Sequence, residues 1–166
     1  MARQLLDHGK HMVLITPRRS PAAALAEHPG VLGHLTTDDP DPKELTALLA
    51  EHPRDVVIAI DDAELVKKDC TASSFLKKWI STAGDAGNAL LLAGGSAELG
   101  SGFSGWHAAA RKGRCGIVIC PQSSSDAEIL GIRMNRSMYV DTVKTGTGYL
   151  HTGDGALHSI TLAHLG

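Results

Sequence analysis

The chain has 166 residues, of which 43% are hydrophobic and only 4% aromatic, and its formal net charge at pH 7 is −2. This length allows one compact domain with an aliphatic core, and the charge excludes a strongly basic surface over the whole molecule. No apolar run approaches the roughly 18 residues that span a bilayer, so we expect no membrane segment.

Short apolar runs alternate with helical patterns along most of the chain. The predicted strands are residues 12–16, 31–35, 56–60, 89–93 and 116–119. The predicted helices are residues 3–8, 22–27, 43–52, 63–82, 105–112 and 125–130. From residue 133 onward the pattern changes, and two runs at 146–150 and 157–162 flank Gly153-Asp154-Gly155, which predicts a β-hairpin.

Three helix ends carry recognisable signals. Ser20 can N-cap the helix at 22–27, because its side-chain oxygen can accept from a free backbone N–H, and Pro21 suits the first helical position. Pro42 opens the helix at 43–52 in the same way. Gly9 is suited to close the first helix, since glycine adopts the left-handed conformation of a C-cap.

The alternation of strands and helices predicts an α/β fold. Right-handed βαβ units would build a mostly parallel sheet between two layers of helices, and the C-terminal antiparallel hairpin would extend that sheet at one edge. The sequence contains no internal repeat and no convincing linker, so we expect one domain over residues 1–166.

The strand at 56–60 is followed directly by two carboxylates, Asp61 and Asp62. A short, mostly β-branched run of this kind is typical of a strand buried on both faces, and its carboxyl end is where open α/β sheets bind ligands. The pattern is that of a Walker B element, whose first Asp helps hold Mg²⁺ on a nucleotide while the second position polarises the attacking water. The alternative is that both acids merely cap a helix starting near Ala63. The local pattern fits the two interpretations equally.

The cysteines and histidines do not predict a metal centre. Cys70, Cys115 and Cys120 form no CxxC pair, and the nine histidines form no HxxxH or HExxH pair. Ligand spacing is the sequence signal for such a site, and it is missing. We expect free thiols in a reducing compartment.

Four segments, in this order, resemble the later part of the FtsK/SpoIIIE family of P-loop ATPases, particularly the actinobacterial branch with the type VII secretion motors. They are residues 9–21 with the turn PRRSP, residues 56–65 (VVIAIDDAEL), residues 103–116 with FSGW and RCG, and residues 146–155 with GTGYL and DG. The resemblance extends over nearly the whole chain, which would be the Walker B half of the ATPase domain.

The resemblance implies a three-layer, RecA-like domain that uses ATP and Mg²⁺ to drive DNA or a secreted polypeptide through a ring of subunits. Asp61 would be the Mg²⁺-associated carboxylate and Asp62 the water-activating one. Ser96 would sense the γ-phosphate, and Arg111 or Arg114 would act on a neighbouring subunit's nucleotide. The alternatives are a turn or N-cap role for Ser96, and for the arginines a solvated helix end that favours positive charge.

The family's phosphate-binding motif GxxxxGK[ST] does not occur in these 166 residues. The resemblance begins within the helix that would follow that motif, so the sequence looks like a motor domain truncated at its N-terminus. Thr147 also stands where the family usually has Arg. Without the P-loop lysine and hydroxyl, we do not expect independent ATP turnover.

Several alternatives remain open. An incomplete sheet would expose an edge, so we expect self-association or completion by another polypeptide. The membrane anchor of many relatives has no counterpart here, which favours the cytoplasm. The chain could instead be a non-catalytic binding module of a motor or secretion assembly. It could also be an unrelated flavodoxin-like domain that binds a metal at Asp61 and Asp62, in which case the strand order would be 2-1-3-4-5.

Overall fold

The structure is a computed structural model in which residues 1–101, 104–139 and 146–161 are described. They form two compact units, residues 1–95 with 104–110 and residues 96–101 with 111–139 and 146–161. Because two packing units can belong to one domain, the single domain over residues 1–166 stays a prediction.

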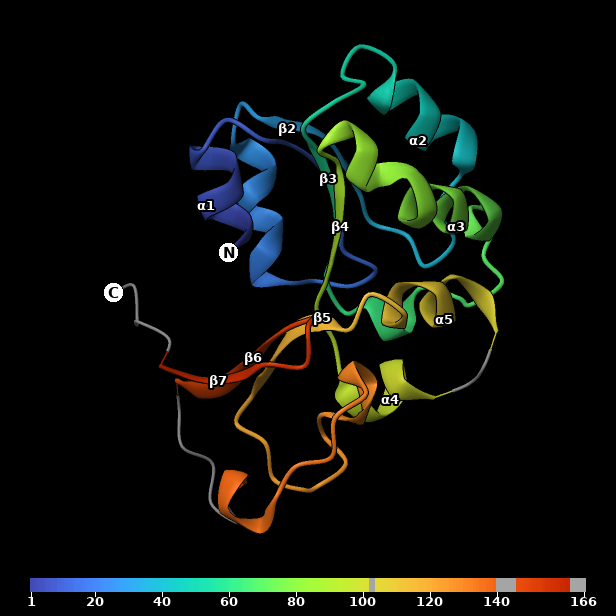
Figure 1. Ribbon diagram of the computed structural model, residues 1–166. Coiled ribbons are helices and arrows are strands. Elements are labelled where there is room, and N and C mark those ends of the chain that lie inside the picture. The colour runs from blue at the N-terminus through green and yellow to red at the C-terminus, as the bar shows by residue number, and fades with distance from the viewer. Residues whose placement is uncertain (102–103, 140–145, 162–166) are drawn as a thin grey trace. The chain divides into compact units, whose positions relative to one another are not determined.

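A four-stranded parallel sheet forms the centre of the first unit (Figure 1). Its strands are β1 (His11–Ile15), β2 (Val31–Leu35), β3 (Val56–Ile60) and β4 (Ala89–Leu92), in the order β2-β1-β3-β4. Ile15 is paired with Ile60, and Ile60 with Leu92. All five residues of β3 are buried, which explains their uninterrupted apolar character. The four strands predicted in this region are therefore confirmed.

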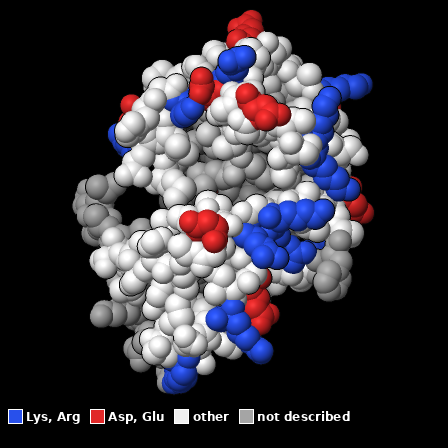
Figure 2. All heavy atoms as spheres, in the orientation of Figure 1, with Lys and Arg blue, Asp and Glu red and all other residues white. Residues whose placement is uncertain are grey.

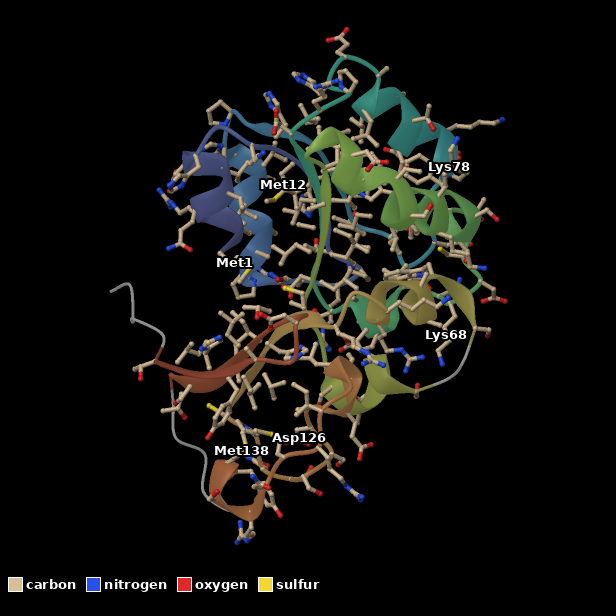
Figure 3. All side chains as sticks on the ribbon, viewed as in Figure 1. Met1, Met12, Lys68, Lys78, Asp126 and Met138 are labelled. Carbon is tan, nitrogen blue, oxygen red and sulfur yellow. The ribbon has the colours of Figure 1, made fainter. Side chains whose placement is uncertain are left out.

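Helices cover both faces of this sheet (Figure 1). One face carries α1 (Ala2–Asp7) and the 3₁₀ helix η1 (Pro21–Glu27), and the other carries α2 (Pro42–Leu49) and α3 (Ser73–Thr82). On the α1 side, Met12 and Leu14 form a buried cluster with Leu6. Figure 3 labels Met12 on the side of the sheet that α1 covers. The predicted three-layer α/β arrangement is confirmed for this unit. No helix among the described residues is long and apolar enough to cross a membrane.

The predicted helix signals act as expected at three positions. Gly9 has φ +80° just after α1, and the Ser20 side chain accepts from the backbone N–H of Ala22 at 3.0 Å. Pro42 is the first residue of α2, whose N-cap is Asp41. The predicted helix at 63–82 is interrupted: it divides into the 3₁₀ turn η2 (Ala63–Leu65) and α3, separated by a loop. Two other short elements of this unit are η3 (Ala83–Ala86) and most of α5 (Gly105–Arg111).

The second unit contains a separate antiparallel sheet. Its strands are β5 (Cys115–Ile119), β6 (Thr147–Thr152) and β7 (Leu157–Thr161), in that order. The predicted hairpin is confirmed as β6–β7, but its predicted attachment to the parallel sheet is wrong. It pairs with β5, which the sequence analysis placed among the parallel strands.

Local backbone geometry is compatible with the pairing of β5 and β6. Gly148 lies opposite Ile119, and a Cβ at residue 148 would approach the carbonyl oxygen of Val118 to 2.6 Å. Glycine therefore permits a close approach of β5 and β6 that other residues would hinder. The unit has a small core around Val118, Ala127 and Met134.

The short helices of the second unit depart from the prediction. The expected helix at 125–130 is reduced to the 3₁₀ turn η4 (Glu128–Leu130). The helix α4 (Ser96–Gly100) and the turn η5 (Arg136–Met138) were not predicted. Both lie in segments rich in glycine or polar residues, where hydrophobic periodicity is weak.

The strand order bears on the flavodoxin-like alternative. The order β2-β1-β3-β4 agrees with the first four positions of a 2-1-3-4-5 sheet, so the fifth strand decides between the folds. β5 pairs antiparallel with β6, and no described strand other than β3 pairs with β4. The flavodoxin-like arrangement is therefore not the one observed.

Candidate functional site

The acid pair, Asp61 and Asp62, lies at the carboxyl edge of the parallel sheet, as predicted. The backbone N–H of Asp61 donates to the carbonyl of Ile15 at the end of β1, at 3.0 Å. The N–H of Ala63 donates to the carbonyl of Ala93, just beyond β4, at 2.9 Å. The pair therefore follows the central strand β3, between the ends of its two neighbours, where open α/β sheets bind ligands.

Asp62 has an unusual backbone and a strong side-chain partner. It is left-handed, with φ 49° and ψ 47°, a conformation that Asp tolerates better than most residues. Asp62 is the N-cap residue of η2, but its carboxylate makes no capping hydrogen bond to that turn. Instead, Arg18 donates from Nε to Oδ2 at 2.7 Å and from Nη2 to Oδ1 at 2.6 Å.

Asp61 is held by the same turn. The hydroxyl of Ser20 donates to Asp61 Oδ2 while its oxygen accepts from the N–H of Ala22 at 3.0 Å. Residues 17–21, the PRRSP turn, therefore contact both members of the acid pair. This turn follows β1, the parallel neighbour of β3, so the sheet register itself places it beside the acids.

The electrostatics of the site follow from these contacts. The hydrogen bond from Arg18 lowers the pKa of Asp62, although partial burial acts in the opposite direction. The pKa of Arg18 is raised, first by its hydrogen bond to Asp62 and its charge interaction with it, and to a smaller extent by the charges of Glu64 and Asp61. Arg18 is thus paired directly with Asp62 and stabilised further by the negative charges of Glu64 and Asp61. Glu64 Oε2 is buried and has no hydrogen-bond partner among the described residues.

The arrangement does not fit a directly bound Mg²⁺. The ion prefers octahedral oxygen ligands, but both oxygens of Asp62 accept from Arg18 and one oxygen of Asp61 accepts from Ser20. Within the described residues, no group of three His, Cys, Asp or Glu side chains is placed to hold a metal ion. A divalent cation at Asp62 would have to compete with the positive charge and the two hydrogen bonds of Arg18.

The other predicted site residues belong to the second unit. Ser96 is the first residue of α4, and Arg111 donates to the carbonyl of Gly100 at the end of that helix. Arg114 has φ 48°, and its carbonyl accepts from Nδ1 of His151. The sensor role of Ser96 and the trans-acting role of either arginine stay predictions, as do the alternatives.

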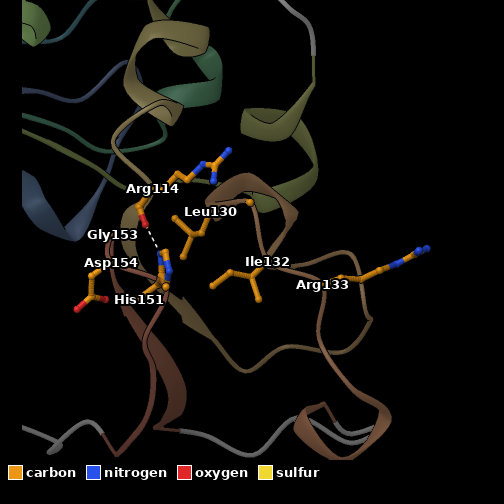
Figure 4. A pocket seen from close by; sticks show the side chains of 9 residues that line it. Arg114, Leu130, Ile132, Arg133, His151, Gly153 and Asp154 are labelled. Atoms are coloured by element: carbon orange, nitrogen blue, oxygen red, sulfur yellow. Dashed lines mark hydrogen bonds between the residues drawn. The ribbon is translucent and has the colours of Figure 1, made fainter.

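A shallow pocket of about 530 Å³ also lies in the second unit (Figure 4). Arg114, Leu130, Ile132 and His151 contribute to its lining, and Figure 4 shows the Arg133 side chain extending away from His151. Its polar groups do not converge on one point, so it is a weaker candidate site than the acid pair.

The sequence analysis missed Arg18, Ser20 and His107 as parts of the site. Nε2 of His107 donates to the carbonyl of Ala63, directly after the acid pair, at 3.0 Å. Arg18 and Ser20 lie in the quoted PRRSP motif, but Arg18 was given no role and Ser20 was predicted only as a helix N-cap. The signal that could have identified Arg18 and Ser20 is their position after a strand, because loops that follow adjacent parallel strands meet at the same edge of the sheet.

The FSGW motif contributes packing through its described residues. Trp106 is fully buried and donates from Nε1 to the carbonyl of Lys67 at 3.0 Å. Gly105 has φ +80°, and a Cβ there would lie 2.5 Å from the carbonyl oxygen of Lys68. The motif therefore joins α5 to the loop between η2 and α3.

No protein-family model and no curated protein matches the chain. Solved structures resemble it, among them two of EssC. The cytoplasmic domain of EssC aligns with a TM-score of 0.68 and 15% identity, over 97% of this chain and 35% of that one. EssC (ATPases 2 and 3) from Geobacillus thermodenitrificans aligns with a TM-score of 0.67 and 17% identity, over 97% of this chain and 33% of that one. The chain spans about a third of those proteins, and it shares the α/β fold of the EssC ATPase domains.

Proposed function

We propose that the chain is a segment of an ATP-driven motor of the FtsK/SpoIIIE type, which moves DNA or protein, and that it does not turn over ATP on its own. The observation that carries this proposal is the position of Asp61 and Asp62. They directly follow β3 in the chain and lie at the carboxyl edge of the parallel sheet. The likeness to EssC ATPase domains supports it at the level of the fold.

In this proposal the acid pair is a Walker B element, with Asp61 on the metal side and Asp62 on the water side. Ser96 is the γ-phosphate sensor, and Arg111 or Arg114 reaches a neighbouring subunit's nucleotide. ATP and Mg²⁺ are the cofactors of the intact motor, which works as a cytoplasmic ring. Each of these roles extends the family resemblance to particular positions.

The phosphate cradle has to come from outside these 166 residues, because they contain no GxxxxGK[ST]. Backbone N–H groups and the lysine of that loop hold the β- and γ-phosphates. Carboxylates cannot replace them, since they repel phosphate unless a metal lies between. We therefore expect the 166-residue chain to bind Mg²⁺-ATP weakly.

Calorimetric titration of the purified chain with Mg²⁺-ATP tests this expectation. The expected result is no binding in the micromolar range. Micromolar affinity that Asp61→Asn abolishes would contradict the requirement for a separate phosphate loop.

A second experiment tests the motor assignment itself. The chain is joined to an N-terminal segment that carries GxxxxGK[ST], and ATP hydrolysis is measured. Hydrolysis that Asp62→Asn abolishes supports a Walker B role. Hydrolysis that is unaffected by Asp61→Asn and Asp62→Asn contradicts it.

A non-catalytic binding module of a motor or secretion assembly is the second candidate function. The contacts of Arg18 and Ser20 favour it, because they satisfy both acids within the chain itself. Figure 2 shows Lys and Arg side chains over α3, where Lys77 and Lys78 are exposed. A solvated helix face is the favoured explanation of these residues, so they do not decide between DNA and protein as the substrate.

A further inference from the structure

We propose that the PRRSP turn withholds the acid pair from divalent cations, and that Arg18 must leave Asp62 before a cation can bind there. The inference rests on the proposed function, because Asp61 and Asp62 are expected to meet a metal only if they form a Walker B pair. It adds a regulation of that site by two residues outside the Walker B element.

The first support is the geometry of the ion pair. The guanidinium of Arg18 uses two N–H groups on the two oxygens of Asp62, at 2.7 and 2.6 Å. Such charge-assisted, two-pronged contacts are short and specific in orientation. Each oxygen of Asp62 keeps a second lone pair, but the guanidinium occupies the side of the carboxylate that would chelate a cation, and its positive charge repels a divalent ion there. Arg18 and the cation therefore compete for Asp62.

The second support is the way in which the turn is anchored. Ser20 donates to Asp61 and also caps η1, so its hydroxyl is fixed on both sides. The N–H of Asp61 donates to the carbonyl of Ile15, which ties the end of β3 to the end of β1. The turn and the acids are thus positioned by the sheet, and little chain ordering is needed to form the contact.

The third support is the difference in exposure between the partners. The side chain of Arg18 is 62% exposed, whereas that of Asp62 is 18% exposed. Arg18 can therefore swing into solvent without disturbing the core, while Asp62 stays at the sheet edge. The contact is consequently reversible by a side-chain movement alone.

Mn²⁺ binding to the chain in the absence of nucleotide tests the proposal. The concentration of free Mn²⁺ is measured by electron paramagnetic resonance in titrations of the wild type, Arg18→Gln and Arg19→Gln. Arg19 is the matched control, because it is an exposed neighbour of equal charge without a hydrogen bond or ion pair to the described part of the chain. We expect Arg18→Gln to bind Mn²⁺ at least about tenfold more tightly than the wild type, and Arg19→Gln to resemble the wild type.

Two further variants identify the site of the added ion. Asp61→Asn in the Arg18→Gln background should abolish the gain. Arg18→Lys keeps the positive charge but loses the planar guanidinium with its two parallel N–H donors. The Mn²⁺ affinity of this variant should therefore lie between those of the wild type and Arg18→Gln. It also provides a measurement if Arg18→Gln folds poorly, which circular dichroism would reveal.

Equal Mn²⁺ affinities of Arg18→Gln and Arg19→Gln would overturn the inference, since general charge would then explain any change. A wild type that already binds Mn²⁺ as tightly as Arg18→Gln would overturn it too. Neither outcome affects the motor assignment, which depends on ATP hydrolysis by the longer polypeptide. Conversely, failure of that hydrolysis leaves the competition between Arg18 and a cation measurable.

Discussion

Arg18 and Asp62 come from different loops, 44 positions apart in the chain, and meet because β1 and β3 are parallel neighbours. The left-handed backbone of Asp62 ends the strand sharply, and its carboxylate accepts from the guanidinium instead of capping η2. Left-handed Asp residues are uncommon and often occur at functional sites. At the scale of the residue, the site is a carboxylate pair already neutralised in part by the protein.

Arg18→Gln is expected to lower the free energy of unfolding near neutral pH but not in acid. Arg18 holds the pKa of Asp62 below its ordinary value of about 3.9. A carboxyl with a lowered folded-state pKa contributes stability above its unfolded pKa and loses that contribution as the pH falls through the folded pKa. The difference between wild type and variant should therefore persist from neutral pH to about pH 4 and then disappear.

Urea unfolding at a series of pH values measures this difference. Arg19→Gln serves as the control, and its free energy of unfolding should stay close to that of the wild type at neutral and at acidic pH. A deficit of Arg18→Gln that stays constant in strong acid would mean that the side chain acts through packing and not through Asp62.

At the scale of the element, capping and close backbone contacts explain where helices begin and how they pack. Asp41 N-caps α2 by accepting from the N–H of Lys43 at 2.8 Å. Trp106 joins α5 to the loop after η2. These contacts involve single side chains, so each can be tested by one substitution.

Asp41→Ala should destabilise the chain by about 1 kcal/mol, because the N–H of Lys43 loses its partner in the first turn of α2. Asp41→Asn should cost only a few tenths of a kcal/mol, since the amide oxygen can accept the same bond. Chemical denaturation of the three proteins gives both values. Equal losses in the two variants would show that charge near the helix end, and not the cap, is responsible.

At the scale of the whole molecule, the chain forms two units with separate sheets and separate cores, and it passes from the first to the second, back to the first for residues 104–110, and then to the second again. The first contains the acid pair, and the second contains Ser96, Arg111 and Arg114. The predicted sensor and trans-acting arginines are therefore carried by a different packing unit from the Walker B candidate.

Gly148→Ala should weaken the second unit selectively. The added methyl group would lie 2.6 Å from the backbone oxygen of Val118, and overpacking of this kind costs about 1–3 kcal/mol. Amide hydrogen exchange should accelerate in β5 and β6 and stay unchanged in β1 and β3. Gly100→Ala is the control, because a Cβ at residue 100 meets nothing within 4 Å. Equal acceleration in both sheets would contradict the separation of the units.

The sequence by itself determined the strands of the first unit, the ends of several of its helices and the position of the acid pair. Buried strands and capped helices depend on neighbours within a few residues, so their signals are local. Asp61 and Asp62 could be placed at a sheet edge because they end a wholly apolar run. The likeness to EssC ATPase domains agrees with that fold.

Only the tertiary structure decided which elements pair and which side chains meet. The apolar run of β5 is compatible with either a parallel or an antiparallel partner, and in the structure it pairs antiparallel with β6, where Gly148 permits a close backbone approach. Likewise, Arg18 has no local feature that directs it to Asp62. Their contact depends on the order and register of β1 and β3, which a pattern along the chain does not specify, because strand pairing is a non-local interaction.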